Sequence, residues 1–282
     1  MVGIMPNYEC SAACKHCLYS CSPTRTPGYM TEAAMDECVV LLVKGGHRSV
    51  HIGGGEPFLN FNGLLTLLKK MADAGIAVDF IETNACWATD EKTITEYLSV
   101  LTKLGVDTFC ISADHFHAAY IPQDYPLRLA EICEKVGFGY FIWRTNESSI
   151  RTGGRALQIE LERNKPKPFE QMLSAEPCTG LMSKNHFHVD MYNRFIPPGC
   201  TGLVLPMQEV VHGIAWGKYP VYEALLNGGV AALFEFAASQ GFVPESAYTS
   251  KCALCFFIRK FLSEQGKFTE LDAEFYVESL KY

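Results

Sequence analysis

Short apolar runs alternate with longer amphipathic stretches along the first 150 residues. Five apolar runs rich in Val, Ile and Phe have the composition of buried strands: 2–7, 49–52, 78–82, 107–112 and 140–144. The stretches between them have helical spacing: 32–44, 64–74, 90–104 and 127–136. Thr31 and Asp90 stand where N-caps belong, and a glycine follows each helix. Strands that alternate with helices predict a parallel sheet covered by helices.

The strand–helix rhythm ends near Gly153-Gly154. About five strand–helix units fit before it, too few for a closed eight-fold barrel, so the predicted fold class is α/β with an open, partial barrel. Beyond it we predict a hairpin at 186–198, a helix near 220–240 and a last packing helix over 268–282. We interpret this part as a second, smaller lobe.

Length and charge narrow the class of protein. The 282 residues, 48% of them hydrophobic, can bury one large core, or a core with a small lobe. A net charge of -7 argues against a protein built around nucleic-acid phosphates. The N-terminus lacks the pattern of a signal peptide, and apolar runs such as 39–43 are too short to cross a bilayer. We therefore predict a cytoplasmic protein with no nucleic-acid and no membrane partner.

The spacing of the twelve cysteines favours metal binding over disulfides. Cys10-x3-Cys14-x2-Cys17 places three thiols on one loop after a strand. Cubic iron–sulfur clusters take thiolate ligands, usually four. Three ligands leave one iron open to a cofactor or substrate, as in open catalytic metal sites. A structural zinc site is the alternative, and Cys21 is interpreted as a free thiol because a fourth ligand would close the site.

This cysteine spacing, ahead of a strand–helix barrel, resembles the radical SAM superfamily. Gly54-Gly55-Glu56-Pro57, after the second strand, resembles the family's GGEP motif, which meets the methionine amino group of S-adenosylmethionine (SAM). The same resemblance implies further SAM contacts at four positions: His16, Thr83, Asn84 and Ser112. Two residues depart from the family's common Asn and Gly: Ser11 and Ala85.

The resemblance also implies the chemistry. It assigns a [4Fe–4S] cluster to Cys10, Cys14 and Cys17, with SAM on the open iron. Such enzymes cleave SAM reductively to a 5′-deoxyadenosyl radical, which abstracts a hydrogen atom from the substrate. A reductant such as flavodoxin or ferredoxin is the implied partner. Three residues at strand ends facing the barrel mouth are the candidate catalytic residues: Asp114, His117 and Arg144.

Four cysteines in the second lobe form a complete thiolate set: Cys178, Cys200, Cys252 and Cys255. The segment 188–200, which ends in Pro-Gly-Cys, and the Cys-x2-Cys pair resemble the SPASM/twitch extension of the same family. A twitch domain holds one auxiliary [4Fe–4S] cluster, and the remaining cysteines are too scattered for a third cluster. Zinc on the same four thiols is the alternative.

With this resemblance the predicted architecture has three parts. Residues 1–165 form a partial (β/α)6 TIM-like barrel, and 166–265 form a twitch-type α+β lobe. Residues 266–282 carry the packing helix. The role of Cys86 stays open between a hydrogen-atom donor and an inert buried thiol.

Three functions compete for this sequence. The first is an oxidoreductase that performs a two-electron oxidation assisted by the auxiliary cluster. It resembles the dehydrogenases of aminoglycoside pathways. The second is a maturase that forms a crosslink, a thioether or an epimer in a ribosomal peptide or protein, so the substrate is either a small molecule or a peptide. The third, a non-catalytic iron–sulfur or zinc protein, is opposed by the Gly54–Pro57 motif and the open three-cysteine set.

Overall fold

A computed structural model describes residues 1–146, 150–174 and 176–282. The chain divides into two compact units, each considered by itself. The first comprises Met1–Cys14, Cys21–Ser149 and Asn185–Arg194, and the second comprises Lys15–Ser20, Ile150–Lys184 and Phe195–Tyr282. The domain limits predicted at residues 165 and 265 remain predictions.

The first unit is built on parallel strands in the order β5-β4-β3-β2-β1-β7. These strands are β1 (Val2–Met5), β2 (Ser49–Ile52), β3 (Ala77–Thr83), β4 (Thr108–Ser112), β5 (Gly139–Trp143) and β7 (Phe187–Asp190). Every neighbouring pair among them is parallel. The predicted α/β class is therefore confirmed, with an open parallel sheet that is consistent with a partial barrel.

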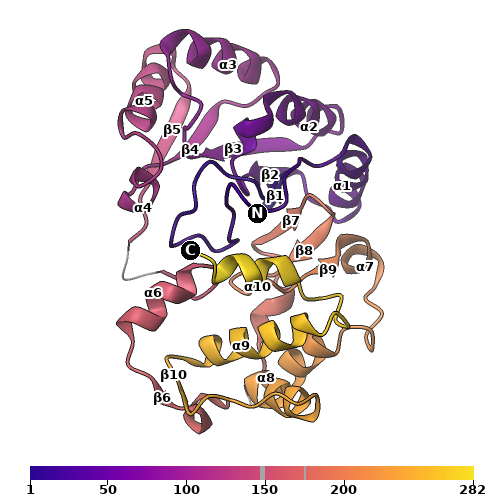
Figure 1. Cartoon of the computed structure of the whole chain (residues 1–282). Coiled ribbons are helices and arrows are strands. Elements are labelled where there is room, and N and C mark those ends of the chain that lie inside the picture. Colours follow the sequence, from indigo (N-terminus) through magenta and orange to yellow (C-terminus); the bar gives the residue numbers. More distant parts are fainter. Residues whose placement is uncertain (147–149, 175) are drawn as a thin grey trace. The chain divides into compact units, whose positions relative to one another are not determined.

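The longer helices of the first unit line one side of this sheet (Figure 1). They are α1 (Glu32–Lys44), α2 (Phe61–Asp73), α3 (Glu91–Lys103) and α5 (Asp124–Val136). Two short elements, η1 (Pro57–Asn60) and α4 (His115–Ala118), follow β2 and β4 at the carboxyl ends of these strands. The hydroxyl of Thr31 and the carboxylate of Asp90 cap α1 and α3 as predicted. Helix α2 begins three residues earlier than predicted because Asn60 accepts a hydrogen bond from the N–H of Gly63 at 2.9 Å.

Successive side chains along each strand point to opposite faces of the sheet, so the two faces carry different residues. Val2 and Ile4 of β1 are fully buried. Gly3, between them, faces the other way and pairs in register with His51 of β2 and His188 of β7. Burial lowers the pKa of His51 to about 4 and that of His188 well below its ordinary value. Both rings are therefore neutral at pH 7.

Asp190, the last residue of β7, is a fully buried carboxylate. It accepts hydrogen bonds from the hydroxyl of Tyr8 at 2.8 Å and from Nε of Arg194 at 2.7 Å. It also accepts the N–H groups of Tyr192 at 3.0 Å and Arg194 at 2.9 Å. The carboxylate thus fixes both the position of β7 beside the loop after β1 and the turn that follows β7.

The second unit, with the strand that leads into it, holds the remaining elements. They are α6 (Ala156–Arg163), β6 (Lys167–Pro168), η3 (Phe169–Met172), η4 (Thr179–Met182), β8 (Arg194–Ile196), β9 (Leu205–Pro206), α7 (Met207–His212), α8 (Pro220–Ser239), β10 (Ala247–Tyr248), α9 (Lys251–Glu264) and α10 (Ala273–Ser279). Helix α10 is shorter than predicted because Asp272 caps it by accepting the N–H of Phe275. Its Phe275 and Tyr276 pack against Phe256 of α9.

Helix α8 lies where the sequence predicts a helix, near residues 220–240. By length and composition alone it could cross a membrane, although the core helix of a soluble protein passes the same test. It is broken at Gly228 and Gly229, whose φ/ψ values are not helical. The cytoplasmic location remains a prediction.

The Asp190 anchor leads to a stability prediction. Replacing Asp190 by Ala removes the acceptor of the half-buried Arg194 guanidinium and the buried Tyr8 hydroxyl, which costs about 3 kcal/mol. For a chain of this size we expect the melting temperature to fall by roughly 6–12 °C, measured by differential scanning fluorimetry on the cluster-loaded protein.

The control for this experiment is Asp124→Ala, which breaks the exposed ion pair with Arg128 on α5. Exposed pairs of this type contribute less than about 1 kcal/mol. Equal shifts in the two variants would show that Asp190 does not anchor β7.

Candidate functional site

The loops after β1 and β2 lie against each other at the carboxyl edge of the sheet. The N–H of Gly55 donates to the carbonyl oxygen of Asn7 at 3.0 Å, and the N–H of Glu56 donates to that of Glu9 at 2.9 Å. A Cβ at Gly55 would lie 2.0 Å from the Glu9 carbonyl oxygen. Only glycine permits this approach. The contact holds the glycine motif beside Cys10, the residue after Glu9.

Glu56 is fully buried beneath this contact. Its carboxylate accepts the hydroxyl of Thr83 at 2.9 Å and the N–H groups of Asn84 at 2.8 Å and Phe58 at 3.2 Å. Burial raises the pKa of Glu56 to about 7, although the three hydrogen bonds oppose the shift. The carboxylate joins the glycine motif after β2 to the end of β3.

Asn84 extends this network to the cysteine loop. Its Nδ2 lies 3.5 Å from Sγ of Cys10 and 3.1 Å from Oγ of Ser11. Ala85 adopts a left-handed backbone with φ of 62°, which explains why glycine is common at this position. The two departures from the family pattern therefore fit the site, because Ser11 bonds to Asn84 and Ala85 takes the glycine-like conformation.

Two supporting residues were missed by the sequence analysis. Asn7 is buried, and its Nδ2 donates to the carbonyl oxygen of Glu56 at 2.9 Å. Trp87 donates from Nε1 to the hydroxyl of Thr83 at 3.0 Å and stacks on Phe58 with a centroid distance of 4.3 Å. An available signal was the polar Asn7 at the end of an apolar strand.

Asp114 organises the end of β4. Its Oδ1 accepts the N–H groups of Phe116 and His117 and lies 2.8 Å from Nδ1 of His117. Its Oδ2 accepts the N–H of Thr145, which follows β5. His117 also hydrogen-bonds to the thiol of Cys14. The predicted pair of Asp114 and His117 is thus brought together next to one cysteine of the first set.

The other predicted site residues differ in exposure. Pro57 is buried at the start of η1, and Ser112 is half-buried at the end of β4. Arg144 is exposed after β5. His16 and Cys17 are half-buried in the segment Lys15–Ser20 of the second unit.

The cysteine chemistry fits iron–sulfur ligation. Of the first set, Cys14 is buried, and Cys10 and Cys17 are half-buried. Cys10 and Cys14 already have polar neighbours, Asn84 and His117, near their sulfurs. Hydrogen bonds of this type to cluster sulfurs tune the reduction potential.

The second cysteine set also converges, within the second unit. Burial raises the pKa of Cys200 to about 12, Arg259 opposes this shift, and the charges of Cys255, Cys252 and Cys178 add to it. The four thiols therefore lie near enough to influence one another electrostatically.

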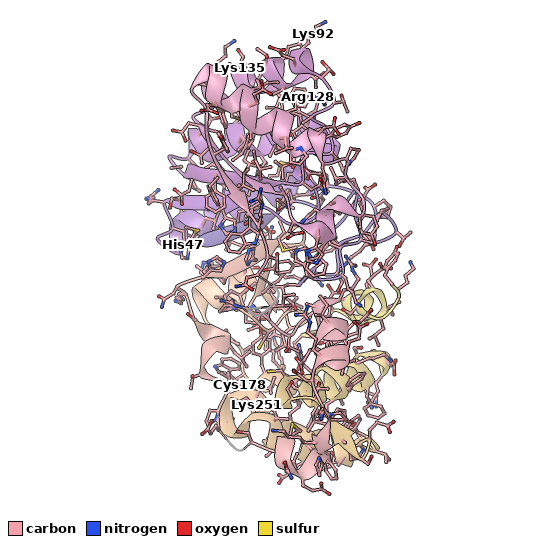
Figure 2. The ribbon with its side chains drawn as sticks, turned by 90° about the vertical axis from the view of Figure 1, so that its left-hand side faces the viewer. His47, Lys92, Arg128, Lys135, Cys178 and Lys251 are labelled. Atoms are coloured by element: carbon pink, nitrogen blue, oxygen red, sulfur yellow. The ribbon has the colours of Figure 1, made fainter. Side chains whose placement is uncertain are left out.

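Arg259 of α9 is a buried cation beside these thiols. It hydrogen-bonds to Cys255 and donates to the carbonyl oxygen of Thr201 at 3.0 Å and the hydroxyl of Tyr276 at 3.1 Å. Lys251, at the start of α9, is a second cation near Cys178 (Figure 2). Sequence reasoning missed Arg259, although it lies one helical turn after Cys255 in an apolar helix.

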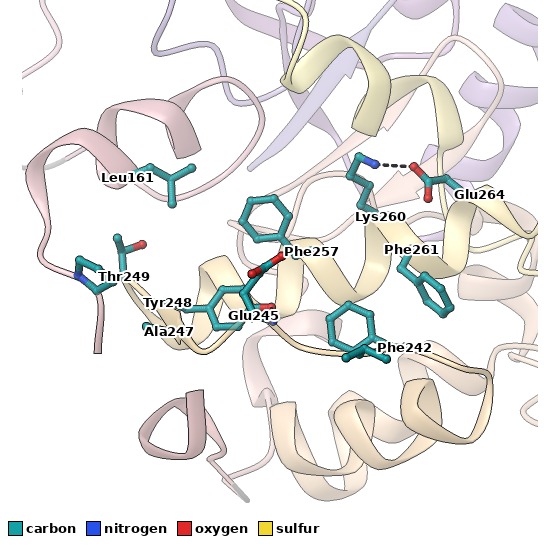
Figure 3. Close-up of a pocket in the computed structure, with 12 residues that line it drawn as sticks. Leu161, Phe242, Glu245, Ala247, Tyr248, Thr249, Phe257, Lys260, Phe261 and Glu264 are labelled. Atoms are coloured by element: carbon teal, nitrogen blue, oxygen red, sulfur yellow. Dashed lines mark hydrogen bonds and ion pairs between the residues drawn. The ribbon is translucent and has the colours of Figure 1, made fainter. Parts of the chain in front are cut away.

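The second unit also contains a cavity of about 390 Å³ whose lining includes no cysteine. Aromatic rings form much of its wall, and Lys260 pairs with Glu264 at its edge (Figure 3). The aromatic lining residues are Phe242, Tyr248, Phe257 and Phe261. None of these residues was predicted, because they gather from separate elements only in the folded unit.

Comparison with known proteins identifies the first half of the chain. Residues 4–140 match the family model described as Radical SAM superfamily. A curated relative, the putative peptide biosynthesis protein YydG of Bacillus subtilis (strain 168), is 30% identical over 121 residues. The match covers 43% of this chain and 37% of YydG, so it spans little more than a third of that relative. The match to the radical SAM family thus covers residues 4–140 of this chain.

Solved structures are similar to this chain as well. BtrN, solved in complex with AdoMet and 2-DOIA, has a TM-score of 0.51 and 16% identity, and the match covers 82% of this chain and 88% of BtrN. Native anSMEcpe with bound AdoMet matches at a TM-score of 0.40 and 20% identity, over 50% of this chain and 42% of that one. At 16% identity the likeness to BtrN concerns the fold alone.

The raised pKa of Glu56 predicts that the free energy of unfolding depends on pH. Folded Glu56 keeps its proton up to about pH 7, whereas the unfolded chain releases it near 4.5. As the pH rises through this window the unfolded state loses a proton that the folded state retains. The free energy of unfolding therefore falls by up to about 3 kcal/mol. The Glu56→Gln variant is neutral at every pH at this position, so it should not show this fall in the free energy of unfolding.

The measurement is urea unfolding of both proteins without SAM between pH 4.5 and 7.5. Other groups titrate alike in both, so only the difference between the two curves reports on Glu56. Parallel curves would contradict the raised pKa.

Proposed function

We propose that this chain is a radical SAM enzyme that modifies a peptide. When bound, a [4Fe–4S] cluster and SAM supply a 5′-deoxyadenosyl radical that removes a hydrogen atom from the substrate. The observation that carries the proposal is the network from Glu56 through Asn84 to Cys10 at the carboxyl edge of the sheet. Parallel barrels place their reactive groups at this edge.

Each predicted site residue has a place in this proposal. Cys10, Cys14 and Cys17 would ligate the cluster. The residues that would contact SAM are His16, Gly54, Gly55, Glu56, Pro57, Thr83, Asn84 and Ser112. Their chemistry suits the ligand, because a buried carboxylate and strand-end polar groups can bind a cationic amine and a ribose.

Asp114, His117 and Arg144 are proposed to act on the substrate. The four donors on the Asp114 carboxylate hold His117 in one orientation. Although burial opposes it, hydrogen bonds to Asp114 and Cys14 raise the pKa of His117 to about 10, so its ring is an imidazolium at pH 7 that can donate a hydrogen bond to the substrate. The exposed guanidinium of Arg144 can bind a carboxylate with two hydrogen bonds.

The four thiols of the second unit are proposed to hold one auxiliary [4Fe–4S] cluster. The charges of the other three thiols act on Cys200, which supports one shared site. Arg259 and Lys251 would offset the negative charge of the thiolates. The region would then be of the twitch type, and a small external reductant such as flavodoxin or ferredoxin would deliver the electrons.

The substrate class rests on the relative. YydG is described as a putative peptide biosynthesis protein, which favours a peptide. The aromatic cavity of the second unit offers a surface of the right size for apolar peptide side chains. A second candidate is the two-electron oxidation of a small molecule, supported by the fold likeness to BtrN along most of the chain and by the four-thiol set.

The first test concerns SAM cleavage. Cys10→Ala should reduce 5′-deoxyadenosine formation by more than about 100-fold, because an open cluster needs all three thiolates. The measurement is chromatography of the products after anaerobic reduction with dithionite. Cys38→Ala is the control, since Cys38 is buried in α1 away from both sets. Absence of cleavage by the unaltered protein would overturn the proposal.

The second test counts clusters. A Cys10/Cys14/Cys17→Ala triple variant should retain about four irons per chain after reconstitution, because the second set stays intact. Iron and sulfide analysis gives the number. Further substitution of Cys252 and Cys255 by Ala should remove these irons. A triple variant without iron, or with zinc in its place, would reject the auxiliary cluster.

A further inference from the structure

Three histidines of the first unit gather on the face of the sheet opposite the helices. They are His51 of β2, His188 of β7 and His186, just before β7. One ring nitrogen from each lies within 4.8 Å of the other two. The ring centroids are 5.6 Å apart for His51 and His186, and 5.2 Å for each of the other two pairs.

The backbone of β1 makes room for these rings. Gly3 lies between His51 and His188 in the register of the sheet. A Cβ at Gly3 would lie 2.4 Å from Nε2 of His188 and 2.6 Å from Nε2 of His51. The ring nitrogens of two strands therefore converge above a residue that has no side chain. Any larger residue would drive the two rings apart.

The surroundings of the cluster suit a cation. Oε1 of Glu82, on β3, lies 3.5 Å from Nε2 of His51. Phe80 stacks on the His51 ring with a centroid distance of 5.0 Å and fixes its plane. Nδ1 of His51 is buried and has no hydrogen-bond partner in the described chain. A buried polar nitrogen without a hydrogen bond destabilises the folded state. A bond from Nδ1 to a metal would offset this cost.

We propose that His51, His186 and His188 bind one divalent metal ion of the zinc type. Three neutral imidazoles form the ligand set of many tetrahedral zinc sites, with a fourth position for a carboxylate or water. A zinc ion with Zn–N bonds of about 2.0–2.1 Å needs nitrogens roughly 3.4 Å apart, which small side-chain rotations supply here. Glu82, whose Oε1 lies 3.5 Å from Nε2 of His51, is placed to be the fourth ligand if Nε2 binds the ion and to orient the ring if Nδ1 does. Calcium and magnesium do not fit, since they prefer oxygen ligands.

The three histidines are not among the residues proposed to hold the cluster or SAM. His186 precedes β7 and His51 lies inside β2, whereas the Gly54–Pro57 motif follows the carboxyl end of β2. An ion here would tie β7 to β2 across β1. Because these strands are far apart in sequence, such a clip closes a long loop and stabilises the folded unit.

The test uses tag-free, full-length protein whose iron–sulfur clusters have been reconstituted, so that the cysteines are occupied. Zinc chloride is the probe. Metal analysis after removal of free ion should find about one zinc per chain, and X-ray absorption should show a nitrogen and oxygen shell at about 2.0–2.1 Å, without sulfur at about 2.3 Å.

Variants locate the ion. His186→Ala is the first, because His186 is exposed and its loss does not disturb the core. It should weaken zinc affinity by at least about 100-fold, and Glu82→Gln by about 10- to 100-fold. The matched control is His47→Ala, since His47 packs on the ring of Phe187, whose side chain alternates with that of His188 (His47 is labelled in Figure 2). Iron content and circular dichroism verify that each variant is folded and loaded.

Three results would overturn the proposal. They are a cluster-loaded protein that takes up no zinc, a sulfur shell around the bound zinc, and equal zinc affinity in His186→Ala and His47→Ala. A nitrogen and oxygen shell that is lost in His186→Ala and kept in His47→Ala supports it. None of these outcomes depends on whether the protein cleaves SAM.

Discussion

The close approach of the Gly54-Gly55 loop to the backbone of Asn7 and Glu9 is the contact on which the rest of the site depends. A side chain at Gly55 would collide with the Glu9 carbonyl, and without this contact Glu56 could not enter the space beneath Thr83 and Asn84. That carboxylate in turn fixes the residue whose amide reaches Cys10. One backbone distance therefore couples the ends of three strands to the first cysteine.

In both units, buried charged side chains lie next to the cysteines. In the first, Asp114 orients His117 beside Cys14. In the second, Arg259 lies among four thiols whose pKa values burial raises. A buried guanidinium is costly unless it is paired, and its presence here implies a compensating negative charge. Thiolates that ligate a cluster would supply that charge.

The two faces of the sheet have different chemistry for a geometric reason. Alternate residues of β1, β2 and β7 form an apolar layer toward the helices, and the residues between them bring Gly3, His51 and His188 together on the other face. The Asp190 carboxylate sets the position of β7. The histidine cluster depends on that position, because two of its members lie on or next to this strand.

The sequence by itself determined the local features of this protein. Apolar runs and caps such as Thr31 and Asp90 specified strands and helices, because these signals act within a few residues. The Cys10–Cys17 spacing and the Gly54–Pro57 motif indicated the radical SAM domain, since the ligands lie on single loops. Tertiary structure alone decided what comes together from distant segments. The carboxylate contacts of Glu56, Arg259 among the thiols, the aromatic cavity and the three histidines all depend on strand register and helix packing. Pairing of this kind is set by the burial of whole faces, which no short stretch of sequence encodes.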